Sequence, residues 1–364
     1  MTAGKILMTT TQWNAWALLG CVALAGCYSS SSQVKDGQSH WMEACQDDGE
    51  CAGDLACVDQ LCVPASVDEP AVAIAALAVT DDAVFWEDLG TTDANGVHLR
   101  NGGVYRFDLE SQQVTAVASS LYMPQRGLFV DDERAYVADA SGVRYFGLED
   151  GAGGGLGNDV SGEAASPWVV AAGSIYYASF RGRSVRRMTP ATGEDRVVLE
   201  VGADLAVLAL ASDGEHVFIE AHQIGLPATA LLAIERDGTQ LELVTDTFRI
   251  TNTDGKFVVN DGLVFSVEGN RTALRVLEVA TGGWQKLGEI DDPSMALRSV
   301  VDSFVYYTLD QSAESTGRRY SMLRSRLAGE PELLHSSADS IGDVVERNGY
   351  VYWVEGSRIL RKRL

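Results

Sequence analysis

The strongest constraint in this sequence is a short aromatic segment that recurs seven times, each time after a turn. Each copy places an aromatic residue among strand-forming residues, as in Asp132–Val137, and the turns before the copies are rich in Asp, Asn and Gly. The seven central aromatics are Phe85, Tyr136, Tyr176, Phe218, Phe265, Tyr306 and Tyr352, and consecutive ones are 40 to 51 residues apart. This period predicts one structural unit repeated seven times, because each unit buries its apolar face only against its neighbours.

The residues around each aromatic predict a blade of four strands. An apolar run such as 127–130 predicts the innermost strand, the aromatic segment is the second strand, and an alternating segment such as Leu274–Leu277 is the third. A short turn then leads to an outer strand such as Leu241–Val244. We therefore expect an all-β, seven-bladed β-propeller over residues 66–364. The alternative, a β-sandwich, would not repeat the same pattern at this spacing.

The last repeat has no fourth strand of its own. Its third strand, Arg358–Lys362, is followed only by two residues. We expect a strand near 67–73 to join residues 340–364 in the last blade and close the ring, which would remove two free sheet edges. The pattern over 67–364 resembles the exported seven-bladed propeller repeats of bacteria, of the broad TolB-like and low-density-lipoprotein-receptor-like kind. No catalytic motif matches residue by residue.

Residues 1–26 predict an export signal. Lys5 gives a basic start, and Trp16–Leu24 is an apolar run too short to span a bilayer. The run ends in Leu24-Ala25-Gly26-Cys27, which resembles the lipobox of bacterial lipoproteins. The resemblance implies acylation of Cys27 and attachment to the lipid bilayer through the acyl chains. A plain secretory signal with a chance cysteine is the alternative. We expect residues 27–43 to form a flexible tether and the protein to lie in the cell envelope, at the outer membrane.

Four cysteines follow the tether within residues 44–65: Cys45, Cys51, Cys57 and Cys62. In an exported protein, an even and local cluster predicts two disulfides. A zinc site is the alternative, although structural zinc sites usually present cysteines two to four residues apart. Three pairings are possible, of which we favour 45–57 with 51–62. The pattern is similar to the small cysteine-rich modules that follow the tether in many bacterial surface lipoproteins.

The composition limits the partners of the chain. It has 51 acidic residues against 28 Lys and Arg, for a net charge of −23 at pH 7. Such a surface repels phosphate backbones, so we expect no nucleic-acid partner. The five histidines form no H-E-x-x-H motif, and no G-x-S-x-G motif is present. We therefore assign no catalytic residue, cofactor or metal, and expect a monomer.

Loop lengths indicate a binding face. The segments between second and third strands at 87–102, 220–229 and 310–318 are long, and in a propeller these loops emerge on the same face as the connections between blades. Four residues on those connections are candidate ligand-binding residues at the channel mouth: Arg126, Trp168, Arg249 and Arg298. Arginine and aromatic side chains are common anchors, and a guanidinium group can receive a carboxylate or sulfate. The alternative is that each arginine pairs with an acidic neighbour such as Asp292 or Asp343.

We therefore expect a membrane-anchored, non-enzymatic propeller scaffold that binds an unknown envelope protein, a glycan or a small ligand on one face. The alternative is a propeller enzyme, a lyase or a glycan-acting hydrolase, with its site at the channel mouth. That alternative requires at least two convergent titratable groups with shifted pKa values. The glycine run Gly151–Gly157 is interpreted as a flexible connection, because no helix follows it to form a phosphate cradle.

Overall fold

The computed structural model describes residues 55–58, 61–64, 66–68, 74–92, 98–122, 125–139, 142–155, 167–179, 182–202, 204–223, 229–235, 241–248, 257–267, 273–281, 283–289, 295–302, 304–310, 319–326 and 329–364. The chain divides into two units, residues 1–62 and 63–364. Strands β1 (Leu55–Val58) and β2 (Leu61–Pro64) form a two-stranded sheet. The predicted signal peptide, the tether, Cys27, Cys45 and Cys51 lie outside the described residues. Cys57 lies in β1 and Cys62 in β2, and their side chains are not described.

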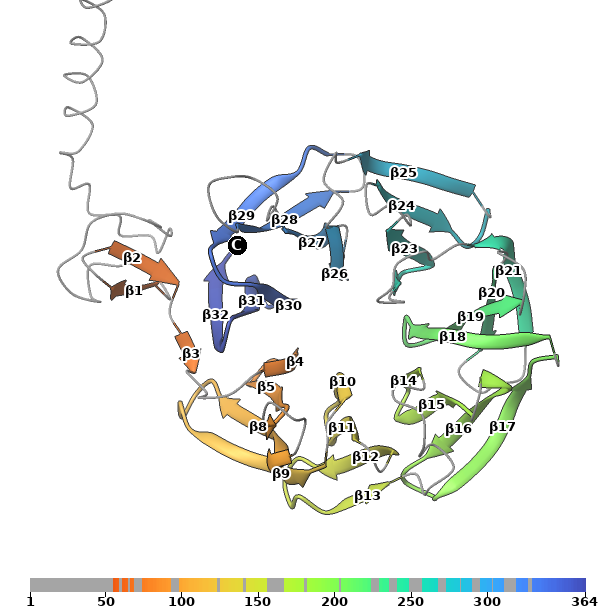
Figure 1. The fold of residues 1–364 in the computed structure, drawn as a ribbon, viewed down its shortest axis with the longest axis horizontal. Helices are drawn as coiled ribbons and strands as arrows, with labels where there is room; N and C mark the ends of the chain where they lie inside the picture. The colour runs from red at the N-terminus through yellow and green to blue at the C-terminus, as the bar shows by residue number, and fades with distance from the viewer. Residues whose placement is uncertain are drawn as a thin grey trace, which may run out of the picture. The chain divides into compact units, whose positions relative to one another are not determined.

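The second unit is a ring of seven four-stranded antiparallel sheets in the described part of the chain (Figure 1). The first four blades are β4 (Ile74–Val79), β5 (Ala83–Asp88), β8 (Gly102–Asp108) and β9 (Val114–Leu121); β10 (Gln125–Val130), β11 (Arg134–Asp139), β12 (Gly142–Gly147) and β13 (Gly153–Gly155); β14 (Trp168–Ala171), β15 (Ser174–Ala178), β16 (Ser184–Thr189) and β17 (Glu194–Glu200); and β18 (Leu205–Ser212), β19 (His216–Gln223), β20 (Thr229–Glu235) and β21 (Leu241–Phe248).

The remaining blades continue the same order. They are β22 (Val258–Asn260), β23 (Leu263–Val267), β24 (Ala273–Glu278) and β25 (Gly283–Glu289); β26 (Met295–Val301), β27 (Phe304–Asp310), β28 (Tyr320–Arg326) and β29 (Glu332–Ser337); and β30 (Ile341–Arg347), β31 (Tyr350–Glu355) and β32 (Arg358–Arg363), completed by β3 (Ser66–Asp68). A small hairpin of β6 (Thr91–Thr92) and β7 (His98–Arg100) lies within the connection from β5 to β8. In the first six blades the first strand in the chain order lies toward the ring centre, and in the last blade β30 does (Figure 1), which confirms the predicted seven-bladed propeller.

The ring is closed by the segment that precedes the first blade. Strand β3 pairs antiparallel with β32, with Ser66 opposite Leu360 and Asp68 opposite Ile359. The predicted closure is confirmed, and the strand lies at the N-terminal end of the expected range. An apolar cluster that includes Trp86 of the first blade and Tyr352 of the last seals the same junction. The pairing of β3 with β32 thus covers the edge of β32 that would otherwise be free.

The seven central aromatics are the buried anchors of this ring. Each side chain is at most 3% exposed. Successive residues of a strand point to opposite faces of a blade, and here both faces pack against a neighbouring blade. Phe85, for example, packs with Leu128 and Ala135 of the second blade. The second strand is therefore buried along its length, as the six buried residues of β5 show.

The turns between first and second strands are tight. Three of them are two-residue turns with both residues at positive φ: Ala172-Gly173, Asp261-Gly262 and Asn348-Gly349. This conformation matches the right-handed twist of a hairpin, and it favours Gly and Asn. In the first, second and fourth blades a side-chain oxygen closes the turn instead. There Thr80, Asp131 and Asp213 accept the backbone N–H of Ala83, Arg134 and His216.

The structure corrects the interpretation of the glycine run. Gly153–Gly155 is not a flexible connection but strand β13, the outer strand of the second blade. A Cβ at Gly154 would lie 2.3 Å from the Tyr145 hydroxyl oxygen, and a Cβ at Gly153 would lie 2.9 Å from the Phe146 ring. These two aromatic side chains lie over the strand, so a side chain at Gly153 or Gly154 would have to displace them.

In the described segments, the chain has no helix that is both long and apolar enough to cross a membrane.

Candidate functional site

The inner strands carry β-bulges at their start or at mid-strand, each followed by three or four residues of the same strand. Five of the seven described inner strands have one, at 74–76 of β4, 125–128 of β10, 207–209 of β18, 297–299 of β26 and 341–344 of β30. We call these the mouth bulges, and the face of the ring on which they lie the mouth face. A bulge leaves one residue unpaired and redirects its side chain. Arg126 and Arg298, two of the predicted binding residues, both lie in mouth bulges.

Arg298 joins the sixth blade to the seventh. Its Nε donates a hydrogen bond to Thr308 Oγ1, and its Nη2 donates one to the Ile341 carbonyl, both at 3.0 Å. Asp343, an acidic neighbour considered above, accepts a hydrogen bond of 3.2 Å from the Leu77 N–H of the first blade. The guanidinium group of Arg298 therefore connects the second strand of the sixth blade, β27, with the inner strand of the seventh, β30.

Trp168 lies at the start of β14 and packs against the second blade. Its ring is 5.0 Å from that of Phe129 in an edge-on arrangement. A Cβ at Gly127, where φ is +154°, would lie 3.2 Å from the Trp168 ring. Trp168 thus contacts the bulge that contains Arg126, whose side chain is outside the described part. Arg249 lies outside the described residues. The described hydrogen bonds of Arg298 are with the sixth and seventh blades, so the structure does not bring Arg298 into contact with Trp168.

Five buried carboxylates at the mouth face were not anticipated from the sequence. They stand at or near the ends of second strands and are at most 6% exposed: Glu87, Asp88, Asp139, Glu220 and Glu355. Burying a charge is costly unless a partner compensates it. The sequence does contain a signal, because each acid follows the central aromatic of its blade by two or three positions.

Three of these carboxylates fix the loops between second and third strands. Asp88 pairs with Arg100 at 2.6 Å, Asp139 with Arg144 at 3.2 Å, and Glu355 with Arg358 at 3.3 Å. Each arginine lies at or near the start of the third strand, and its side chain is 34–43% exposed. The hydrogen bond that Arg100 donates to Asp88 raises the pKa of Arg100 above its ordinary value. These pairs hold the bases of the loops with their cationic heads partly in solvent.

Glu355 also ties the sixth blade to the seventh. Its Oε2 lies 2.5 Å from Nε2 of His335 on β29 and accepts a hydrogen bond of 3.3 Å from the Trp353 indole. Burial alone would raise the pKa of the Glu355 carboxyl. The hydrogen bond to His335 and the charge of His335 lower this pKa, and together with the other hydrogen bonds they outweigh the effect of burial. The net pKa lies below the ordinary glutamate value, so this carboxyl is held ionised.

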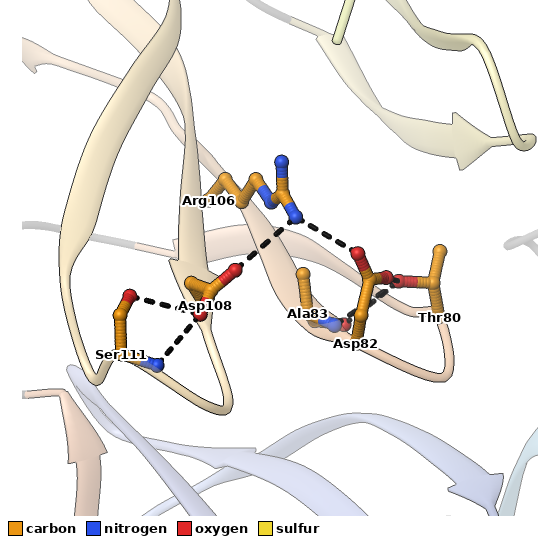
Figure 2. Close-up of polar contacts among 6 residues, drawn as sticks. All are labelled: Thr80, Asp82, Ala83, Arg106, Asp108 and Ser111. Carbon is orange, nitrogen blue, oxygen red and sulfur yellow. Dashed lines mark hydrogen bonds and ion pairs between the residues drawn. The ribbon is translucent and has the colours of Figure 1, made fainter. Parts of the chain in front are cut away.

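The opposite face is held by its own short turns. Arg106 donates to Asp82 in the turn after β4 at 2.8 Å and to Asp108 at the end of β8 at 3.3 Å (Figure 2). Asp108 in turn accepts the N–H and hydroxyl of Ser111, both at 2.8 Å (Figure 2). In the third blade, burial and a hydrogen bond to Asp195 raise the pKa of Tyr177 to about 12. Other polar groups of this face link blades: Arg347 of the seventh blade pairs with Asp81 of the first at 2.5 Å, and Asn260 of the fifth donates to the Asp302 carbonyl of the sixth at 3.1 Å.

Among the described residues, no group of three or more His, Cys, Asp or Glu is arranged to hold a metal ion.

No family model matches the sequence, and no curated protein matches it either. Three solved structures of similar fold are a catalytically inactive virginiamycin B lyase from Staphylococcus aureus with quinupristin, the computationally designed protein Ika8, and a prolyl endopeptidase. They are 13%, 12% and 14% identical, with TM-scores of 0.57, 0.53 and 0.54. The alignments cover 83%, 82% and 77% of this chain and 98%, 98% and 46% of the other chains. At these identities the likeness concerns the fold alone: the chain is a seven-bladed β-propeller.

Proposed function

We propose that this protein is a lipid-anchored, non-enzymatic binding scaffold of the bacterial cell envelope, with its ligand on the mouth face. The observation that carries the proposal is the set of mouth bulges. Each bulge interrupts a strand ladder, and bulges tend to occur where a side chain must be redirected. Five of them leave residues of five inner strands outside the strand ladder at a similar level of the ring.

The side chains at the mouth bulges suit a ligand with both apolar and anionic groups. Leu208, in the bulge of β18, is 48% exposed although it is a large hydrophobic residue. Arg126 occupies the bulge of β10, next to the position that Trp168 covers. Apolar, aromatic and guanidinium groups together are common where a partner is desolvated. An envelope protein or a glycan with acidic groups fits this combination.

The described carboxylates of the mouth face favour binding over catalysis. Asp88, Asp139 and Glu355 fix loops through arginine, and the Glu355 carboxyl is held ionised by His335. Glu87 accepts the N–H of Gly127 in the next blade. A lyase or glycan-acting hydrolase would need two such groups converging on a substrate. Here the described hydrogen bonds and ion pairs of Asp88, Asp139, Glu355 and Glu87 are with loop and neighbouring-blade groups of the protein itself.

Membrane attachment is part of the proposal. The lipobox at Cys27 and the polar segment 27–43 support an acylated N-terminus at the outer membrane. The cysteine-rich segment 44–65, with two disulfides, would separate the anchor from the propeller. The ordered entry of the chain into the last blade through β3 supports this order of parts, because the anchored segment then continues directly into the ring.

The test is co-purification from native membranes with a variant that alters the mouth face and leaves the blades intact. The variant combines Arg126→Ala, Leu208→Ser and Arg249→Ala, and it spares Trp168 and Arg298, whose contacts join blades. The control carries Glu133→Ala and Glu194→Ala, two exposed residues of the opposite face. We expect mass spectrometry to identify a partner with the wild type and the control but not with the mouth variant. Undiminished recovery by a folded mouth variant would place the ligand elsewhere.

A further inference from the structure

The outer edge of the second blade differs from the other outer edges. Strand β13 consists of Gly153, Gly154 and Gly155, and Gly153 and Gly155 are exposed. Exposed edge strands are usually protected by charged side chains, which hinder the addition of another strand. Strand β17, the outer strand of the third blade, follows this rule with exposed Glu194, Asp195 and Arg196. Strand β13 has no side chains with which to do so.

The backbone of β13 presents hydrogen-bonding groups outward. The N–H of Gly147 donates to the carbonyl of Ala152, which faces β12. Successive residues of an antiparallel strand alternate in direction, so the N–H and C=O of Gly154, opposite Tyr145, also face β12. The corresponding groups of Gly153 and Gly155 then face away from the blade. An added strand would find two donors and two acceptors in one short row.

The side chains beside this edge supply surfaces for alternate residues of an added strand. Tyr145 lies over Gly154 on one face of the sheet. On the other face, Phe146 lies over Gly153, and the guanidinium carbon of Arg144 is 4.9 Å from the Phe146 ring centre. Directly opposite residues of neighbouring strands contact each other on the same face. Because Gly154 contributes no side chain, the partly exposed Tyr145 ring can contact a neighbouring strand, whereas Phe146 is 6% exposed and packs into the apolar core.

The charge near the edge selects a basic partner. Glu149 and Asp150 form the exposed turn that leads into β13. Arg144 of the adjacent strand β12 is paired with the buried Asp139 at 3.2 Å, so its charge is compensated within the blade. Complementary charge speeds encounter and disfavours acidic partners. We propose that the outer edge of the second blade binds an extended basic segment of a partner protein, which adds to β13 as a fifth strand.

The test uses a defined probe and a pair of substitutions at one position. The probe is a nine-residue peptide of alternating lysine and valine, labelled for fluorescence anisotropy, and its counterpart replaces lysine with glutamate. Gly155→Pro removes an outward N–H, whereas Gly155→Ala keeps it. A Cβ at Gly155 meets only Arg144 Cγ at 3.4 Å and backbone atoms farther off, so the alanine variant fits the blade. Proline is tolerated on an edge strand where the N–H faces solvent. Both variants are made in the full-length protein, and thermal unfolding verifies the fold.

We expect the lysine peptide to bind the wild type and Gly155→Ala with affinities within about twofold, and Gly155→Pro at least about tenfold more weakly. Hydrogen exchange of the segment containing Gly153 and Gly155 should slow when the peptide is added. Equal binding by Gly155→Pro, or equal binding of the glutamate peptide, would overturn the proposal. So would a peptide-free dimer that Gly155→Pro abolishes, since the edge would then belong to a second copy of this chain. The mouth variant should bind the peptide normally, which separates this site from the proposed function.

Discussion

Glu87 of the first blade accepts, through its Oε2, a hydrogen bond of 3.2 Å from the backbone N–H of Gly127 in the second blade. The carboxylate is fully buried, and its partner lies in a mouth bulge. Asp343 and Leu77 form the same kind of link from the seventh blade to the first. Side chains of one blade thus hold the inner-strand backbone of the next. The bulges are fixed parts of the scaffold because their irregular backbone groups have partners in neighbouring blades.

Replacing Glu87 with alanine should destabilise the ring. The change removes the acceptor of a buried N–H, which costs about 1–3 kcal/mol. We expect Glu87→Gln to recover part of this loss, since its amide oxygen can still accept the Gly127 N–H. Urea unfolding measures both variants, with the exposed Glu133→Gln as control. Equal stability of Glu87→Ala and the control would show that the link contributes nothing.

The contact between Glu355 and His335 predicts a stability that depends on pH. The pKa of Glu355 lies below the ordinary value of 4.5 in the folded protein. The unfolded chain therefore takes up this proton first as pH falls, so the contribution of Glu355 is present above the ordinary value and is lost as pH falls through the folded pKa. We expect Glu355→Gln to be about 1–3 kcal/mol less stable than the wild type at pH 7. The gap should narrow in denaturant unfolding between pH 5 and pH 3, and a gap independent of pH contradicts the assignment.

The sequence reveals most of the fold because the anchors repeat. Phe85 and Tyr352 belong to one pattern, so both ends of the ring and the missing strand can be counted. The bulge at Arg298 cannot be found this way, since it shifts the register by one residue and leaves composition unchanged. Its acceptor at Ile341 is a backbone carbonyl, which has no sequence signal. The contact of Glu87 with Gly127 depends on how two blades meet, and no local pattern encodes it.

The third strands carry a second repeated sequence signal. In four blades the third strand places an arginine directly opposite the central aromatic: Arg106, Arg187, Arg324 and Arg361. The glycine strand β13, in contrast, carries no strand signal in the sequence. Strand predictions depend on alternating side chains, and Gly153–Gly155 has none. Only the positions of Tyr145 and Phe146 in the folded blade explain why these residues form a strand.

A side chain at Gly154 should displace the Tyr145 ring. Gly154→Ala places a methyl group 2.3 Å from the Tyr145 hydroxyl oxygen, so the outer end of this ring must shift, and a side chain forced off its rotamer costs about 0.5–1.5 kcal/mol. Gly155→Ala is the matched control, because its methyl group lies at ordinary contact distance. Shortening the neighbour in the double variant Gly154→Ala with Tyr145→Ala should recover much of the loss. A double-mutant cycle from denaturant unfolding tests this, and additive effects would refute the steric explanation.

Removing the closing segment should open the ring. Deletion of residues 64–73 eliminates β3 and leaves the outer edge of β32 exposed. We expect a loss of several kcal/mol, since apolar area at the junction contributes about 25 cal/mol per Å². Calorimetry with light scattering should show a lower unfolding temperature and faster aggregation. A deletion of 44–60, which retains β3, is the control and should keep the unfolding temperature of the ring. Equal behaviour of the two deletions would mean that β3 does not secure the closure.

Cys27→Ala should release the protein from membranes. The residue follows the Leu24-Ala25-Gly26 segment of the lipobox, and acylation there would supply the hydrophobic anchor. Stable attachment generally needs more than one acyl chain, so the loss of the acylated residue should leave too little affinity to retain the protein. Detergent phase partitioning measures the change, with the wild type in the detergent phase and Cys27→Ala in the aqueous phase. Cys45→Ala is the matched control, because it removes a cysteine but not the lipidation site, and it should stay with the detergent. Cys27→Ala remaining in the detergent phase would show that another part of the chain provides the anchor.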